Sequence, residues 1–401
     1  MRAIEPPRFG RAVPILPHRY ESLDALRGIC ALCVCLFHFK ANSPVTDFWF
    51  VRNSWLFVDF FFVLSGFVIA AGYRDRLIAG MPLKSFIILR LGRIYPLHFV
   101  LLLVLVATEC AGLLLSVRGE HQRQMFDGAH SVAAIFTNLT LTQSFGLHPT
   151  LTWNQPAWSI ATEFWAYVLF ALAAHWAGPK LDRYLLIAVA VCGLVILLVN
   201  PRGINVSHDW GMLRCIYGFA MGALAWQVWQ SAGLRPAAAG GSATATELAM
   251  LAAVVGFVAY AGSTRFDLLA PQLFAATVLV FARQAGAVSR LLVTPPLLRL
   301  GVLSYSIYMV HLFVQSRFDD VLRLAGRVTG QTFLLRRPVG DHMVTVIGTT
   351  PLQGTIFIIV MLAVVVAVSY FTWRYIEMPG QRWGKRLAAR VSVGEGTRVI
   401  A

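Results

Sequence analysis

The chain has 401 residues, of which 57% are hydrophobic and only 13% charged, and its formal net charge at pH 7 is +15. This composition, with a mean hydropathy of +0.66, excludes a water-soluble globular domain and indicates a polytopic helical membrane protein. The apolar stretches are continuous rather than alternating, which argues against a β-barrel. The excess of basic residues fits cytoplasmic loops and anionic lipid headgroups, so no nucleic-acid partner is expected.

About ten apolar segments of membrane-spanning length follow one another along the chain. They predict an all-α, polytopic membrane helix bundle with both termini inside, since this orientation places most Lys and Arg residues in the cytoplasm. Residues 1–22 are expected to form a cytoplasmic tail, 23–378 the membrane domain, and 379–401 a second cytoplasmic tail. The two long connections, 117–156 and 318–353, would be outer loops, and the second is unusually basic. The predicted spans lie near 23–41, 54–72, 94–116, 157–177, 184–200, 210–230, 247–263, 267–283, 297–317 and 354–376.

The first span carries a stripe of ionisable residues. Arg27 and His38 are about three helical turns apart and share a face, with Asp24 beside them. Ionisable groups inside a membrane helix are rare and are functional candidates by default. The stripe predicts a passage from one membrane surface to His38. The alternative is a helix with polar ends in the headgroup region and an imidazole bonded to a neighbour. The small residues along the passage would be Gly28, Ala31 and Cys35.

Two later spans each contain an acid within an apolar run. Asp59, at the outer end of the second span, could bond to His38 and fix its tautomer, or it could equally pair with an arginine or a headgroup. Glu163, in the fourth span, lies at the depth expected of His38 and needs a partner or a function. Ser65, beside Gly66, is expected at a close contact between helices.

Basic residues open the third span, and polar residues recur near the chain's end. Arg90 and Arg93 share a helix face at the inner surface, where they could bind phosphate or simply anchor the topology. Tyr308 and His311 have the helical spacing of residues that face the bundle together. The pair Arg374 and Glu377 is expected to form a local ion pair, and Pro379 to stop the last helix.

These residues together resemble the acyltransferase 3 family of integral membrane acyltransferases. Each motif alone is weak, but six occur in order over most of the chain. They are Leu23-Asp24-x-Leu26-Arg27-Gly28 with His38; Val58-Asp59 through Ser65-Gly66-Phe67; Arg90-x-x-Arg93; Trp158-Ser159 with Glu163; Ser304-Tyr305-Ser306-x-Tyr308-x-x-His311; and Tyr375-Ile376-Glu377-x-Pro379.

The resemblance implies a ten-helix enzyme of the bacterial inner membrane that O-acylates carbohydrates. Its expected partners are an acyl-CoA donor such as acetyl-CoA, a carbohydrate acceptor and membrane lipids, with no metal and no permanently bound cofactor. His38 would act in the chemistry with Glu163 and Asp59. Arg90 and Arg93 would handle the donor, and Asp24 and Arg27 would lie along its path. Ser65, Tyr308 and His311 are further site candidates.

Two departures from the family pattern are visible. Phe37 stands where the family often has tyrosine, and Thr162 precedes Glu163 where paired acids are common. Longer relatives often carry an esterase-like domain after the membrane part, so acceptor acylation here could require a separate periplasmic partner.

Two questions of function stay open at this point. His38 could be a general base or an acyl carrier. A transporter or flippase for a small molecule or lipid-linked sugar is the rival function, since polar stripes also suit a permeation path. Transporters often show repeated halves, and no internal repeat is evident. For an enzyme, the donor phosphates would bind at Arg90 and Arg93 while the thin arm follows the stripe to His38.

Overall fold

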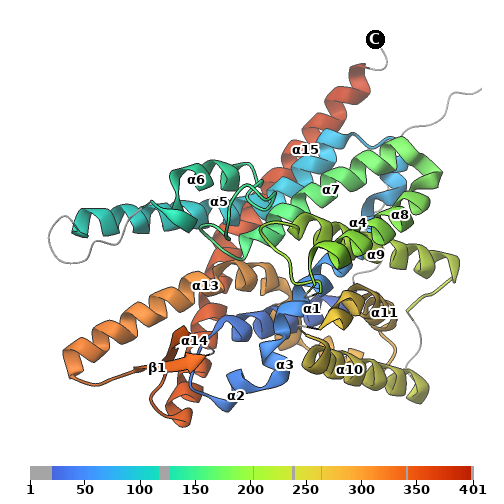
Figure 1. Ribbon diagram of the computed structural model, residues 1–401. Helices are drawn as coiled ribbons and strands as arrows, with labels where there is room; N and C mark the ends of the chain where they lie inside the picture. Colours follow the sequence, from blue (N-terminus) through green and yellow to red (C-terminus); the bar gives the residue numbers. More distant parts are fainter. Residues whose placement is uncertain are drawn as a thin grey trace, which may run out of the picture.

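A computed structural model describes residues 20–116, 126–201, 203–236, 240–262, 264–339 and 342–398. These residues form a helical bundle with one small antiparallel sheet, and α1 lies near its centre (Figure 1). The long helices are α1 (Glu21–His38), α4 (Phe57–Ile78), α5 (Leu83–Ser116), α7 (Ala157–Ala177), α8 (Leu181–Val199), α9 (Gly211–Ser231), α10 (Gly241–Ala261), α11 (Ala270–Ala282), α13 (Pro295–Thr329), α14 (Pro351–Thr372) and α15 (Met378–Arg398). The short helices are α2 (Pro44–Asp47), α3 (Trp49–Arg52), α6 (Val132–Leu139) and α12 (Ala287–Leu292).

Every predicted span falls on one of these helices, so the all-α prediction is confirmed. In the described part of the chain, seven segments are long and apolar enough to cross a membrane, and one of them, Ala157–Val199, contains both α7 and α8. Helix α1 is not one of these seven segments, and it carries Glu21, Asp24 and Arg27 within its length. The chain is a multi-pass integral membrane protein, while the count of ten crossings and the orientation stay predictions.

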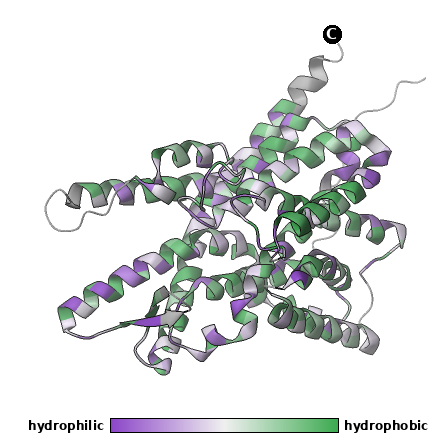
Figure 2. Cartoon of the chain, viewed as in Figure 1, coloured by the Kyte–Doolittle hydropathy of each residue, from purple (hydrophilic) through white to green (hydrophobic). Residues whose placement is uncertain are grey.

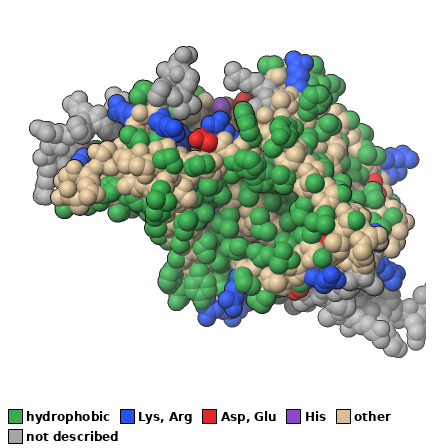
Figure 3. All heavy atoms as spheres, turned by 90° about the horizontal axis from the view of Figure 1, so that it is seen from below, with side chains coloured by type: hydrophobic (Ala, Val, Ile, Leu, Met, Phe, Trp, Pro, Cys, Tyr) green, Lys and Arg blue, Asp and Glu red, His purple; other side chains and the backbone are tan. Residues whose placement is uncertain are grey.

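The surface is consistent with a membrane environment. Hydrophobic residues run along most helices, and hydrophilic residues gather near the far end of α13 and the hairpin (Figure 2). One face of the molecule is a broad hydrophobic area, with Lys and Arg side chains along its edges (Figure 3). Lipid in contact with such a hydrophobic face would remove its apolar side chains from water.

The predicted outer loop 318–353 is wrong in its secondary structure. Helix α13 continues to Thr329 and ends at Gly330, whose φ of 71° is the left-handed conformation common after a helix. An antiparallel hairpin follows, with β1 (Leu334–Val339) paired to β2 (His342–Ile347). Its end joins the rest of the protein through a bridge between Ile347 and Ala41. The basic region that was predicted to be an outer loop is therefore folded.

The predicted C-terminal tail is largely a helix. A π-helical turn, Trp373–Glu377, links α14 to α15, and α15 packs on α5. The contact is close because glycines meet, and a Cβ added to Gly92 would lie 2.8 Å from the Cα of Gly384. Pro379 does not stop the helix as expected. It is the second residue of α15, where the preceding wide turn accommodates its ring and its missing N–H.

Helices α4 and α9 pack even more closely, which gives a stability prediction. A Cβ on Gly66 would lie 1.9 Å from the carbonyl oxygen of Phe219, and one on Gly222 would lie 1.8 Å from that of Val63. We expect Gly222→Ala to lower the free energy of unfolding by at least about 1–3 kcal/mol, since neither backbone can yield locally. Thermal unfolding of the purified protein in detergent would measure this.

The matched control is Gly256→Ala in α10, where an added Cβ meets nothing within 4 Å. Alanine there should leave stability unchanged or raise it by up to about 1 kcal/mol, because glycine is a poor helix former. Equal melting temperatures for both variants would show that the α4–α9 contact tolerates separation.

Candidate functional site

A cavity of about 720 Å³ lies among α1, α4, α5, α7, α13 and α15. It extends along α4 from Val58 to Tyr73, which is about 22 Å at the helical rise. One end of the cavity is charged and the other is largely apolar. Most of the candidates from the sequence line it: Asp24, Arg27, Ser65, Arg90, Arg93, Glu163 and Tyr308. Three do not: His38, Asp59 and His311.

Arg90 offers unused hydrogen-bond donors at the charged end. Its Nη2 donates to the Tyr73 hydroxyl at 2.8 Å, and its guanidinium lies 4.7 Å from the centre of the Tyr73 ring. Its Nε is buried without a hydrogen-bond partner. Within the described residues no carboxylate lies within ion-pair distance of Arg90. Lys385 and Gln381 of α15 line the same end. This end of the cavity can therefore accept an anion.

Arg93 lies one turn deeper and faces several acids. Asp24, Glu163 and Glu377 line the same cavity as Arg93. Glu377 is 3% exposed and accepts hydrogen bonds from Ser306 at 3.1 Å and Gln381 at 2.9 Å. Arg93 therefore shares the cavity with carboxylates but, like Arg90, has none within ion-pair distance among the described residues.

The predicted ion pair between Arg374 and Glu377 is wrong. Both residues belong to the π-helical turn, whose wider spacing separates side chains three apart. The Glu377 side chain instead reaches α13 and α15 and lines the cavity. Sequence analysis assigned Glu377 to a structural pair and missed it as a cavity residue. The signal was an acid at the end of a strongly apolar helix.

Glu163 finds its partner on its own helix. The Tyr167 hydroxyl donates to Glu163 Oε1, and the same hydroxyl lies 2.8 Å from Ser65 Oγ. Since the Tyr167 proton goes to the carboxylate, Ser65 donates to Tyr167. Ser65 is therefore a cavity residue, while its neighbour Gly66 makes the close helix contact. Tyr167 was missed, although its spacing four residues from Glu163 places both on one helix face.

The passage expected beside Gly28, Ala31 and Cys35 does not exist. An added Cβ on Gly28 would lie 2.5 Å from the backbone nitrogen of Gly301, so α1 and α13 touch at their backbones there. Ala31 is 1% exposed and Cys35 is 0% exposed. Small residues on this face allow two helices to approach, as they do in many membrane proteins. The open space begins beside Asp24 and Arg27 of α1 and extends along α4.

Arg27 of α1 forms hydrogen bonds to α13 beside this contact. Its Nε donates to Ser304 at 2.8 Å and its Nη2 to the carbonyl of Gly301 at 3.1 Å, and it forms an ion pair with Asp24 at 3.2 Å. Asp24 and Arg27 both line the cavity, as the predicted donor path required, but Arg27 already uses several of its donors.

His38 meets His311, outside the cavity. His38 Nδ1 lies 2.9 Å from the carbonyl oxygen of Val34, and His311 Nδ1 lies 2.6 Å from that of Tyr308. A carbonyl only accepts, so both Nδ1 atoms carry hydrogen. His311 Nε2, 3.3 Å from His38 Nδ1, is then a second and more distant acceptor of the same Nδ1 hydrogen. This network leaves the lone pair of His38 Nε2 free to take a proton.

The possible contact between Asp59 and His38 is wrong, and the alternative pairing with an arginine is correct. Asp59 Oδ2 lies 2.7 Å from Arg214 Nη2, and Oδ1 lies 2.9 Å from Nε. The two side chains are 0% and 2% exposed. The guanidinium also lies 5.1 Å from the centre of Trp55 and 5.5 Å from that of Trp158. Arg214 was missed, although an arginine within the apolar run of the sixth predicted span was the available signal.

Comparison with known proteins adds to this geometry. A family model described as an acyltransferase domain matches residues 20–374. The chain is 26% identical over 328 residues to acyltransferase MdmB of Streptomyces mycarofaciens, covering 74% of this chain and 79% of that protein. It is 24% identical over 331 residues to peptidoglycan O-acetyltransferase OatA of Listeria monocytogenes, covering 76% of this chain and 50% of that protein.

A shorter match is closer in sequence. The chain is 30% identical over 192 residues to protein 2 in the picA locus of Rhizobium radiobacter, covering 45% of this chain and 95% of that protein. No solved structure matches the chain.

Proposed function

The chain belongs to the acyltransferase 3 family of membrane acyltransferases, and from this premise we propose that it transfers an acyl group, acetyl being the expected one, from acyl-CoA to a carbohydrate hydroxyl. The acceptor would be a cell-surface or lipid-linked glycan, and the site of action the bacterial inner membrane. One observation carries the proposal: a long cavity with cations at one end reaches the aromatic layer beside the His38–His311 pair.

The cavity suits a donor with phosphates at one end and a thin arm at the other. Arg90, with its unpartnered Nε, and Lys385 would bind the phosphates, and Arg93 would add a second guanidinium one turn deeper. The arm would run along α4, past Ser65 and Glu163, toward Phe61 and Tyr308. The path predicted along Gly28 is replaced by this one.

His38 would act as the general base. Because the Tyr308 ring lies between the cavity and the histidines, transfer requires this ring to turn aside. His38 Nε2 then takes the proton of the acceptor hydroxyl while the hydroxyl oxygen attacks the thioester carbonyl. The carbon–sulfur bond breaks, and the proton passes from the imidazolium to the leaving thiolate. His311 Nε2 accepts from His38 Nδ1 and so stabilises the positive charge that His38 gains. A separate periplasmic partner could deliver an acceptor from the outer side.

The decisive test separates an enzyme from a transporter. Purified protein in detergent would be given acetyl-CoA carrying a radiolabelled acetyl group together with surface glycans from cells that lack the gene. Label in the glycan, with matching loss of O-acetyl groups in the mutant cells by mass spectrometry, would support the proposal. Movement of acetate or sugar across vesicles without transfer would instead identify a transporter.

The arginines give a prediction for donor binding. Replacing Arg90 or Arg93 by alanine should weaken acyl-CoA binding about 10- to 100-fold, because a charge-assisted hydrogen bond to phosphate contributes about 1.5–3 kcal/mol. Lysine should rescue only in part, since it cannot form a bidentate contact. Isothermal titration with acetyl-CoA would measure both effects.

Arg183, an exposed arginine of α8 that does not line the cavity, is the matched control. Its replacement by alanine should leave binding unchanged. Unchanged affinity in both Arg90→Ala and Arg93→Ala would mean that these arginines only fix the orientation of the chain in the membrane.

A further inference from the structure

We propose that Phe61 and Tyr308 form the end wall of the cavity and limit the donor to a short acyl group. The inference rests on the acyl-CoA donor proposed above and adds the residues that set its acyl specificity. It follows from the direction of the cavity and from what lies behind its far end.

The direction of the cavity is fixed by its lining. Its charged end is built from the end of α4 and the start of α5, at Tyr73 and Arg90, with Lys385 of α15. Its far end is built from the start of α4 and the start of α7, at Val58, Phe61 and Ile160. A donor held by its phosphates at the charged end therefore presents its acyl group to the far end.

Aromatic rings held in place close the far end. Phe61 and Tyr308 meet edge to face, with ring centres 5.7 Å apart. The Tyr308 hydroxyl lies 2.8 Å from Ser159 Oγ, and Ser159 in turn donates to the carbonyl of Pro156. Tyr308 therefore donates to Ser159 and cannot turn without losing this bond. Ring packing thus holds Phe61 in place, and a hydrogen bond holds Tyr308 in place.

The space behind the wall is filled. Tyr308 is 5% exposed and its ring centre lies 5.9 Å from that of His311, which lies 4.9 Å from His38. Phe62 and Ile160, also at the far end, are 1% and 5% exposed. A thioester against the wall is one ring layer from the histidines, while added carbons would have to displace close-packed side chains.

Binding of CoA thioesters of increasing length tests the wall. Purified protein in detergent would be titrated with acetyl-, butanoyl- and hexanoyl-CoA. We expect the parent to bind butanoyl-CoA at least about tenfold more weakly than acetyl-CoA, the discrimination that steric limits on added methylenes can give. Phe61→Ala should reduce this difference to about twofold or less. Tyr308→Phe, which keeps the ring, should retain most of it.

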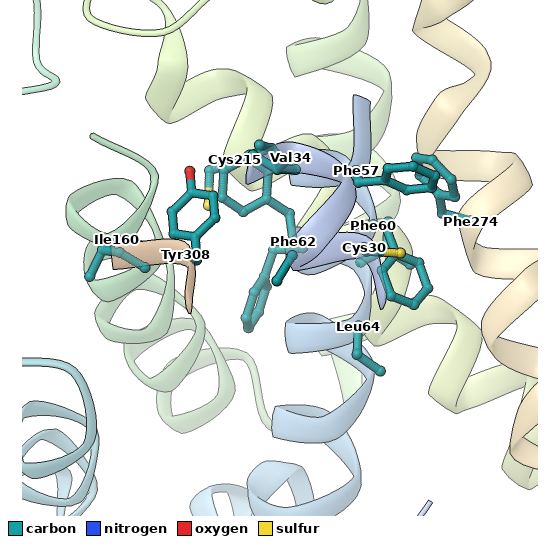
Figure 4. Packing of buried hydrophobic residues seen from close by; sticks show 14 of the residues in the cluster. Cys30, Val34, Phe57, Phe60, Phe62, Leu64, Ile160, Cys215, Phe274 and Tyr308 are labelled. Atoms are coloured by element: carbon teal, nitrogen blue, oxygen red, sulfur yellow. The ribbon is translucent and has the colours of Figure 1, made fainter. Parts of the chain in front are cut away.

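The matched control is Phe60→Ala, which removes the same volume from the same helix. Phe60 packs against Phe274 with ring centres 5.7 Å apart, and Figure 4 shows this pair on the opposite side of α4 from Tyr308 and Ile160. It should leave the acetyl-to-butanoyl ratio at the parental value. Should Phe61→Ala fail to fold, Phe61→Leu is expected to give an intermediate ratio.

The outcomes are distinguishable from a failure of the proposed function. A parent protein that binds no CoA thioester overturns the donor proposal and the wall with it. A parent that binds all three thioesters equally keeps the donor proposal but refutes the wall. The longer acyl groups would then extend toward lipid past Val68, which is 39% exposed. Discrimination that survives in Phe61→Ala would also refute the wall.

Discussion

Replacing His38 by alanine is expected to abolish acyl transfer, with a loss of at least about 10²- to 10⁴-fold, the usual contribution of a positioned general base. The expectation rests on His38 Nε2, whose lone pair is left free by the hydrogen bonds at Nδ1. Donor binding should persist, because His38 does not line the cavity. Transfer of labelled acetyl to glycan and titration with acetyl-CoA would measure the two effects separately.

His175 provides the control for this experiment. It is exposed near the end of α7, so His175→Ala should transfer acetyl at the parental rate. Normal acylation by His38→Ala would remove His38 from the mechanism. An acetyl group found on His38 by mass spectrometry after rapid acid quenching would make the residue an acyl carrier rather than a base.

Replacing Arg214 by alanine is expected to lower the free energy of unfolding by about 3–5 kcal/mol, the usual effect of breaking a buried ion pair. The reason is that Asp59, 0% exposed, would keep a charge with no counterion. The double variant Asp59→Asn with Arg214→Met should recover part of the loss, since neither charge remains. Thermal unfolding in detergent, followed by size-exclusion chromatography, would rank the variants.

The exposed pair Arg317 and Asp320, 3.0 Å apart, is the control for a surface ion pair. Its removal should change stability by no more than about 1 kcal/mol. If Asp59→Asn instead kept its stability and lost acyl transfer, Asp59 would have the catalytic role that the sequence suggested.

The helices were predictable because each membrane span is a long run of apolar residues in the sequence. All ten predicted segments fall on helices, although α5 begins at Leu83 instead of 94, α10 begins at Gly241 instead of 247, and α13 continues to Thr329 instead of 317. The hairpin of β1 and β2 was not predictable in this way. Its strands, each of six residues, have no membrane-length signal and follow a helix that extends past its apolar part.

The partners of the site residues were harder to predict. Asp59 and Arg214 are 155 residues apart in the chain, and His38 and His311 are 273 apart. Which spans touch depends on helix packing, and a single sequence does not contain the neighbour order of the helices. The contact between Glu163 and Tyr167 was within reach because it is local, four residues along one helix.

The backbone contact between Gly28 and Gly301 has a consequence for how this protein can change over evolutionary time. From each glycine, the helix runs ten residues to a histidine, His38 on α1 and His311 on α13. The two helices thus run side by side for about 15 Å from the glycine contact to the imidazoles. A methyl group at either glycine would push α1 and α13 apart at this contact. It would also separate the rings of His38 and His311, whose nearest nitrogens are 3.3 Å apart. Amino-acid substitution at positions 28 and 301 is therefore restricted by the contact between His38 and His311, which neither glycine touches.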